Sequence, residues 1–220
     1  MKYLGIPLSP NKLTRQECQQ LVEKITNRIR GWNRNKLSYA GRIRLTNAVL
    51  MNMHIYWSSI IILPEAVIQQ VIQMCRSFLW RGDATSTRSP LVAWDILCKP
   101  KSKGGLGIKQ IEARSIAVVD KYVWNIASKA DNLWVKWVNH IYLEGTTCWE
   151  YKASASASWS SKQIVRVKNS LKDEFHNQTG KWKGNKSGNY TIADTYKWLT
   201  KDESPNLHWT KVVWSRFEHS

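Results

Sequence analysis

The residues most suited to chemistry in this sequence are basic side chains that gather near its N-terminus. They surround the junction of two predicted helices, and one tryptophan lies among them. The cluster consists of Arg28, Arg30, Trp32, Arg34, Lys36, Arg42 and Arg44. Because a guanidinium group binds phosphate oxygens through paired hydrogen bonds, such a cluster can follow a nucleic-acid backbone. The alternative is a solvated basic face near a helix C-terminus, where the helix dipole favours cations.

A second basic group precedes a glycine-rich segment. Lys99, Lys101 and Lys103 are followed by Gly104-Gly105-Leu106-Gly107. A glycine-rich loop can cradle phosphate, but no Gly-Lys-Ser/Thr sequence closes this one, so it is not a P-loop. A flexible turn is the simpler interpretation, and the three lysines are a secondary candidate for nucleic-acid binding.

The sequence contains no recognisable catalytic set. The histidines form no pair at metal-ligand spacing, and the cysteines form no Cys-x-x-Cys pair. Two-metal phosphoryl transfer needs carboxylates that the fold brings together. Four aspartates could converge in principle, although none lies in a paired-aspartate strand: Asp83, Asp95, Asp120 and Asp131. We therefore expect no catalytic residue, no metal site and no cofactor.

The composition favours a polyanionic partner. The chain has 220 residues, with 33 Lys and Arg against 16 Asp and Glu, a formal net charge of +17 and 43% hydrophobic residues. The apolar content is enough for a core, and the charge favours nucleic acid or an anionic membrane surface, unless the protein is simply basic and soluble. No apolar run could span a membrane, and the N-terminus lacks a signal-peptide core. We expect an intracellular protein of the nucleus or cytoplasm.

Hydrophobic spacing predicts a mainly α fold. A capping box from Thr14 to Glu17 should begin a first helix that ends near Gly31. Ser38 should begin a second, buried helix, and Pro64 and Gly82 are typical of the two ends of a third. Later helices are predicted at about 110–129, 132–143, 159–173 and 193–199, with hairpin strands at Trp182-Lys183 and Tyr190-Thr191-Ile192.

The remaining tryptophans and a serine-rich segment complete the expected architecture. Most tryptophans outside the basic cluster lie on apolar helix faces, which predicts packing in the core. This group comprises Trp57, Trp80, Trp94, Trp124, Trp134 and Trp137. The alternating Ala and Ser residues of 153–158 indicate a linker.

The segment Lys2-Tyr3-Leu4-Gly5-Ile6-Pro7-Leu8 resembles part of the reverse transcriptases of LINE-type non-LTR retrotransposons, especially those of plants. An ordered series of further segments carries the resemblance through residues 1–143. The series comprises Trp32-Asn33, Leu37-Ser38-Tyr39-Ala40-Gly41-Arg42-Ile43, Tyr56-Trp57, Leu63-Pro64, Phe78-Leu79-Trp80-Arg81-Gly82, Val92-Ala93-Trp94, Cys98-Lys99-Pro100-Lys101, Gly104-Gly105-Leu106-Gly107-Ile108 and Leu133-Trp134-Val135-Lys136-Trp137. The C-terminal part of the chain is similar to the start of the zinc-binding region that follows in plant elements. This similarity is carried by Gly188 with Tyr190-Thr191-Ile192 and by Tyr196 with Trp198-Leu199.

The resemblance and the composition together predict a division of the chain, with a boundary near residue 150. Residues 1–13 would form the end of the palm, with Tyr3, Leu4 and Gly5 beside the primer grip. The parts that follow would be a thumb-like helical bundle at 14–82, a helical extension at 83–145, a linker at 146–158, and a small α+β tail at 159–220 that begins a zinc-binding-like region.

The same resemblance implies a function. In this family the thumb holds the template–primer duplex, so the basic cluster would contact RNA, DNA or an RNA–DNA hybrid. The catalytic aspartates of the palm would precede Met1, and the zinc ligands would follow Ser220. We expect a non-catalytic fragment of an RNA-directed DNA polymerase, acting alone or with a palm domain supplied in trans. The alternatives are a helical protein-interaction module and a remnant of a decayed element with no nucleic-acid role.

Overall fold

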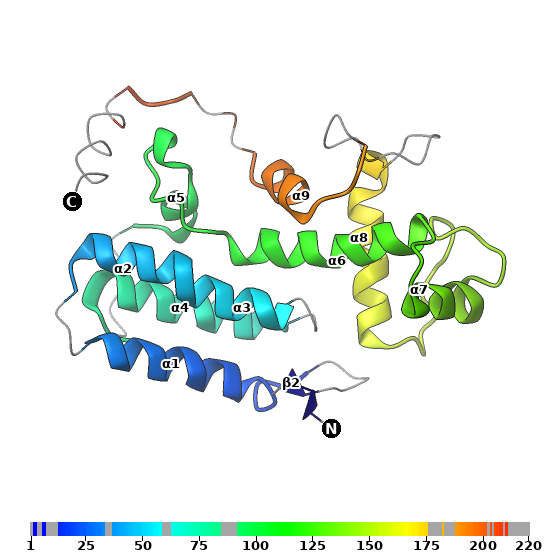
Figure 1. Ribbon diagram of the computed structural model, residues 1–220, viewed down its shortest axis with the longest axis horizontal. Coiled ribbons are helices and arrows are strands. Elements are labelled where there is room, and N and C mark those ends of the chain that lie inside the picture. Colours follow the sequence, from blue (N-terminus) through cyan, green and yellow to red (C-terminus); the bar gives the residue numbers. More distant parts are fainter. Residues whose placement is uncertain are drawn as a thin grey trace. The chain divides into compact units, whose positions relative to one another are not determined.

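The computed structural model is mainly helical, which confirms the predicted fold class (Figure 1). It describes residues 2–3, 6–7, 13–33, 37–58, 63–84, 92–175, 182, 188–201, 203, 205–208 and 210. Within these ranges, no helix is long and apolar enough to cross a membrane.

The chain forms two compact units. We call them the α1–α5 unit, which consists of Leu13–Glu112 and Asp202–Ser220, and the α6–α9 unit, which consists of Met1–Lys12 and Ala113–Lys201. Whether the predicted segments 14–82, 83–145 and 159–220 behave as separate pieces stays a prediction.

Helix α1 (Gln19–Asn33) begins after the predicted capping box. The Thr14 backbone N–H donates to Glu17 Oε2 at 2.7 Å, and the Glu17 N–H donates to Thr14 Oγ1 at 3.3 Å. These two bonds satisfy amides that a helix start leaves without partners. The apolar stripe of this segment is fully buried and comprises Cys18, Leu21, Val22, Ile25 and Ile29.

The second predicted helix is a continuous run of three pieces, α2 (Tyr39–Leu45), the π-helical η1 (Thr46–Leu50) and α3 (Met51–Ser58). Ser38 caps it by accepting a hydrogen bond from the Gly41 N–H at 3.2 Å. The dense apolar content of this segment predicts a buried helix, and the structure confirms burial for Leu50 and Trp57. For the other apolar members the prediction was wrong, namely Ile43, Leu45, Val49, Met53 and Tyr56. These side chains are half-buried or exposed, and α2 contains no buried residue.

The buried face of this run follows the three- and four-residue spacing of a helix. Its members are Thr46, Leu50, Met51, His54, Trp57 and Ser58. A π-helical turn contains more residues than an α-helical turn, so η1 rotates the residues after it relative to a regular helix. Three members of the buried face are polar, namely Thr46, His54 and Ser58.

His54 is the titratable group of that buried face. Its Nε2 lies 3.0 Å from Ser58 Oγ, and no described residue hydrogen bonds to its Nδ1. Burial lowers the pKa of His54 to about 4, because a charged imidazole loses its hydration there. The ring is therefore neutral at physiological pH and contributes to packing rather than to a charged site.

We expect His54 to make the α1–α5 unit less stable in mild acid. An unfolded histidine takes up a proton near pH 6.5, whereas the folded one does so near pH 4. Stability should therefore fall by about 1.4 kcal/mol per pH unit between these values as pH decreases. Urea midpoints at pH 7 and pH 5 should show a smaller loss for His54→Gln than for the parent. Equal losses would contradict the assignment.

Helix α4 (Glu65–Arg81) is the central element of the α1–α5 unit. Pro64 precedes it as predicted, and Gly82 ends it at φ 80°, a left-handed conformation that favours glycine. Both α1 and α2 contact α4 (Figure 1). Short helix α5 (Trp94–Cys98) and the 3₁₀ turn η2 (Lys101–Lys103) follow it.

The α6–α9 unit is built from α6 (Ile111–Ala127), α7 (Leu133–Val138), the π-helical η3 (Asn139–Leu143), α8 (Trp159–Phe175) and α9 (Ile192–Leu199). Helix α6 begins two residues before the unit does. Buried Trp182 joins three of the helices. It packs against Trp124, Trp149, Val167, Tyr190 and Leu199.

The predicted hairpin strands do not form at the residues that the structure describes. Ile192 is the first residue of α9, and Thr191 caps that helix by accepting a hydrogen bond from the Asp194 N–H at 3.1 Å. Trp182 and Tyr190 have no strand assignment, although the Trp182 N–H donates to Gly188 O at 3.0 Å. A side-chain cap therefore competes successfully with strand pairing at this position.

Candidate nucleic-acid interface

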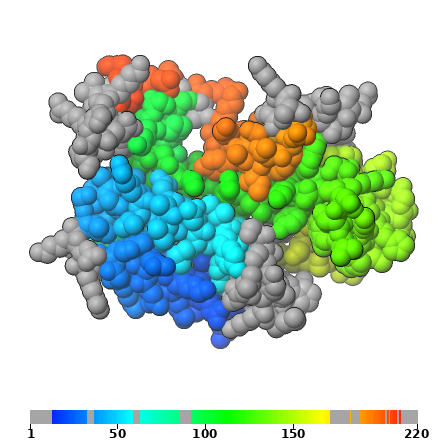
Figure 2. Space-filling model, viewed as in Figure 1, coloured from blue at the N-terminus to red at the C-terminus, as the bar shows by residue number. Residues whose placement is uncertain are grey.

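The end of α1 and the start of α2 meet at the C-terminal end of α4. The Trp32 and Phe78 rings are 5.5 Å apart, and so are the Tyr39 and Trp80 rings. Arg42 Nη1 donates to Phe78 O at 3.4 Å. The structure thus brings the α1 part and the α2 part of the predicted basic cluster to the C-terminal end of α4. Figure 2 shows the surface of α1 to α3 in blue and cyan.

Arg42 has a structural position within this junction. Its guanidinium lies 5.7 Å from the centre of the Tyr39 ring, and its bond to Phe78 O places a cation at the carbonyl end of α4. Helix dipoles favour a cation there. The side chain is half-buried. We therefore assign Arg42 to holding α2 on α4, and expect it to contribute less to phosphate binding than an exposed arginine.

Among the described residues of the cluster, the exposed arginines are Arg28, Arg30 and Arg44. Arg28 and Arg30 stand on either side of the buried Ile29. Because successive helical residues are rotated by about 100°, these two side chains leave opposite flanks of α1. The arginines therefore do not form one row. They surround the junction, a geometry that suits several phosphates better than a single one.

Trp32 is half-buried, and its ring packs against the ring of Phe78. Its contact with a ligand stays a prediction. Arg34 and Lys36 lie outside the described residues.

The lysine-containing turn is ordered by its own backbone, which differs from the flexible turn that we predicted. The N–H groups of Gly104, Gly105, Leu106 and Gly107 donate to the carbonyls of Lys101, Pro100, Leu97 and Lys99, respectively, at 2.9–3.2 Å. A phosphate cradle needs free amides, and these are occupied. Any nucleic-acid contact by Lys99, Lys101 and Lys103 would therefore use their side chains, of which Lys101 is exposed.

The segment with the predicted primer-grip residues is extended. Strand β1 (Lys2–Tyr3) pairs antiparallel with β2 (Ile6–Pro7), and Tyr3 faces Ile6 in the register. Leu4 and Gly5 lie outside the described residues.

A polar pocket of about 290 Å³ lies elsewhere in the α1–α5 unit. Its lining includes Arg76, Trp94, Asp95 and Glu112, and the Arg76 guanidinium lies 5.7 Å from the centre of the Trp94 ring. Two carboxylates beside one guanidinium disfavour phosphate. This pocket is therefore not an extension of the arginine cluster.

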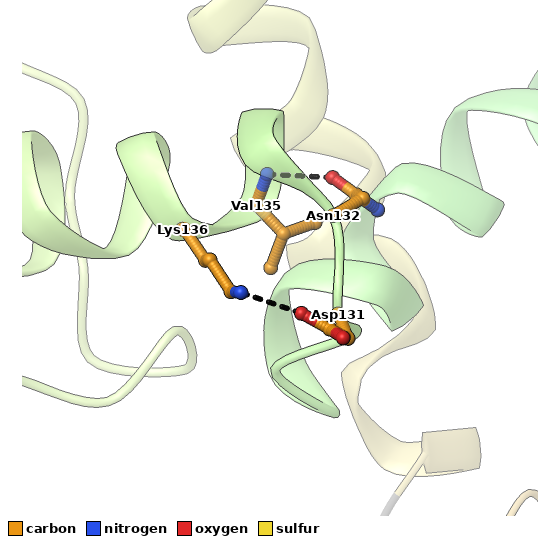
Figure 3. Close-up of polar contacts among 4 residues, drawn as sticks. All are labelled: Asp131, Asn132, Val135 and Lys136. Carbon is orange, nitrogen blue, oxygen red and sulfur yellow. Dashed lines mark hydrogen bonds and ion pairs between the residues drawn. The ribbon is translucent and has the colours of Figure 1, made fainter.

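The four aspartates named above as candidate metal ligands do not share one environment. Asp120 is fully buried in α6, whereas exposed Asp131 forms an ion pair with Lys136 at 2.6 Å (Figure 3). Asp83 and Asp95 belong to the α1–α5 unit. In the described part of the chain, no three His, Cys, Asp or Glu side chains are close enough together to hold a metal ion.

The exposure of two tryptophans on α7 was not predicted. Trp134 is 38% exposed and Trp137 is 51% exposed, so their assignment to the core was wrong. The six residues of α7, Leu-Trp-Val-Lys-Trp-Val, are apolar on almost every side, and only Val135 is buried. A short helix with an all-round apolar surface cannot bury every side chain, and this feature of the sequence could have indicated exposure.

One curated protein is similar to this chain, and the match is partial. It comes from Arabidopsis thaliana, its provisional name is ribonuclease H protein, and it is 30% identical over 156 residues. The match covers 71% of this chain and 25% of the relative, so the chain spans about a quarter of the length of the protein it matches. No family model and no solved structure matches the chain.

Proposed function

We propose that this chain is the thumb region of a non-LTR retrotransposon reverse transcriptase and that it holds an RNA–DNA or related duplex by its backbone. The observation that carries the proposal is the junction at the end of α4. There α1 and α2 present Arg28, Arg30 and Arg44 to solvent around a fixed aromatic core. Several cations on a rigid support can neutralise several phosphates at little entropic cost.

Two further features support this proposal. The formal net charge of +17 is typical of proteins that bind polyanions. The similarity to a protein named for ribonuclease H agrees with a retroelement origin, since some relatives of these reverse transcriptases carry a ribonuclease H domain. Contacts to phosphates position a duplex without reading its sequence, so we expect weak sequence selectivity.

Replacing the three exposed arginines should weaken duplex binding and reduce its dependence on salt. For Arg28→Gln, Arg30→Gln and Arg44→Gln combined, we expect about 10- to 100-fold weaker binding of a short RNA–DNA hybrid. The slope of log K against log salt should decrease in magnitude by about 3, one for each lost phosphate contact. Fluorescence anisotropy over about 50–200 mM salt measures both quantities. Arg42 is left intact because its loss would disturb the α2–α4 contact.

A matched variant separates the site from general charge. Lys109, Lys121 and Lys197 are exposed elsewhere in the chain, so their combined change to Gln removes the same charge. This control should retain most of the affinity and most of the salt slope. If both variants lose affinity and salt slope equally, the duplex responds to the overall positive charge, and the arginine cluster is not a specific site. No binding of the parent chain to any duplex would favour the protein-interaction alternative.

A further inference from the structure

A surface pocket of about 210 Å³ lies in the α6–α9 unit, between the α7–η3 segment and the first half of α8. Its walls are mainly aromatic and aliphatic. The aromatic members are Trp134, Trp137, Tyr142 and Tyr151. This volume is below the range typical of drug-sized ligands, so the pocket suits a single ring system.

The aromatic rings are held in place before any ligand arrives. Trp137 makes an edge-to-face contact with Tyr142 at 5.5 Å, and Trp134 makes another with Tyr122 at 5.4 Å. The start of α7 is fixed as well, because Asn132 Oδ1 accepts a hydrogen bond from the Val135 N–H at 2.8 Å (Figure 3). Trp137 nevertheless remains 51% exposed. A rigid, exposed aromatic surface is typical of a binding site.

One side of the pocket is polar. Ser158, Ser160 and Ser161 line it where α8 begins. Lys168, only 3% exposed, also lines it and donates to Trp149 O at 3.1 Å and to Tyr151 O at 2.6 Å. A ligand with a flat apolar face and a hydrogen-bonding edge matches this combination better than an aliphatic side chain does.

The sequence of the unit that contains the pocket is basic, which favours a polyanion. Residues 113–201 contain fourteen Lys and Arg against seven Asp and Glu. On α8, exposed Lys162 and Arg166 each directly follow a pocket-lining residue, Ser161 and Val165. A nucleobase has a flat face and a polar edge, and its strand carries phosphates that these cations would attract.

We propose that this pocket takes one unpaired base of a single-stranded nucleic acid, stacked on Trp137, with the adjoining phosphates near Lys162 and Arg166. Stacking is tolerant of base identity, so single strands of different sequence should bind similarly. The site lies in a different unit from the arginine cluster and acts on single strands. If the pocket does not bind single strands, the proposal that the arginine cluster binds a duplex is unaffected. If the arginine cluster does not bind a duplex, the pocket proposal is likewise unaffected.

The test uses the full chain with a labelled oligothymidylate and a matched abasic strand. Trp137→Ala should weaken binding of the oligothymidylate by about 5- to 100-fold, whereas Trp137→Phe should retain most of the affinity. The abasic strand should bind the parent weakly, and it should bind Trp137→Ala with the same affinity as the parent. Leu133→Ala is the control, since Leu133 is 86% exposed on α7 and does not line the pocket.

A measurement on the parent protein keeps the proposal testable if a variant misfolds. The oligothymidylate should protect exposed tryptophan from quenching by acrylamide, and the abasic strand should not. Equal affinity of Trp137→Ala and the parent, or equal protection by both strands, would overturn the proposal. So would a concentration-dependent dimer that Trp137→Ala abolishes, because the face would then belong to contacts between copies of the chain.

Discussion

Gly105→Ala should strongly destabilise the α1–α5 unit. A Cβ atom at this position would lie 2.0 Å from Lys99 O and 2.5 Å from Lys99 C. These neighbours are backbone atoms of a turn that its own hydrogen bonds hold, so they cannot move aside cheaply. Packing conflicts of this kind cost about 1–3 kcal/mol in side-chain cores, and we expect at least the upper value against backbone. That is a large part of a typical domain's stability.

Gly31→Ala is the matched control for that substitution. Gly31 lies within α1, and a Cβ there would meet nothing within 4 Å. Alanine is the better helix former by about 1 kcal/mol, so this variant should be neutral or slightly stabilised. The urea midpoint should therefore fall for Gly105→Ala and stay equal or rise slightly for Gly31→Ala. A Gly105→Ala protein as stable as the parent would show that the turn is looser than its geometry indicates.

The second large effect concerns Asp120, a buried carboxyl group in the α6–α9 unit. Thr195 Oγ1 donates to Asp120 Oδ2 at 3.3 Å, and no described residue hydrogen bonds to Asp120 Oδ1. Burial raises the pKa of Asp120 to about 7, although hydrogen bonds from Tyr190 and Thr195 oppose that rise. The carboxyl group therefore holds α9 on α6 best when it is protonated.

Stability of the α6–α9 unit should fall as pH rises from about 4 to 7. Over this range folded Asp120 keeps a proton that the unfolded chain has released. The expected slope is about 1.4 kcal/mol per pH unit, and the loss is complete above the folded pKa. Asp120→Asn cannot ionise, so it should lack this dependence and exceed the parent in stability at pH 8. Urea unfolding at pH 5 and pH 8 provides the comparison.

Amide hydrogen exchange in α9 provides a local check. Protection of the Thr195 region should weaken with rising pH in the parent and stay constant in Asp120→Asn, after correction for intrinsic exchange. Parallel behaviour of the two proteins would show that Asp120 does not carry the effect. Because buried His54 acts with the opposite sign, the two units should lose stability at opposite ends of the pH range.

Local sequence signals determined much of the helical framework. Thr14 and Glu17 form the capping box that their spacing predicts, and Ser38 caps the second helical run. Pro64 and Gly82 bound α4. The caps depend on residues three positions apart, and Pro64 and Gly82 act through their own backbone conformations. These features therefore form without contacts from distant parts of the chain.

Hydrophobic spacing also missed two features that are themselves local. The π-helical η1 interrupts the second run, and the cap between Thr191 and Asp194 replaced a predicted strand. In the candidate interface, the sequence identified the arginines but not their roles. Only the structure shows that Arg42 binds the carbonyl end of α4 while Arg28, Arg30 and Arg44 face solvent.

The sequence by itself determined a mainly helical, strongly basic chain and the residues that could bind phosphate. Only the tertiary structure decided which tryptophans are available to a ligand and which glycine-rich amides are already occupied. The physical reason is that hydrophobic spacing records which residues prefer to leave water. It does not record whether a neighbouring element is present to cover them, as the exposure of Trp134 and Trp137 demonstrates.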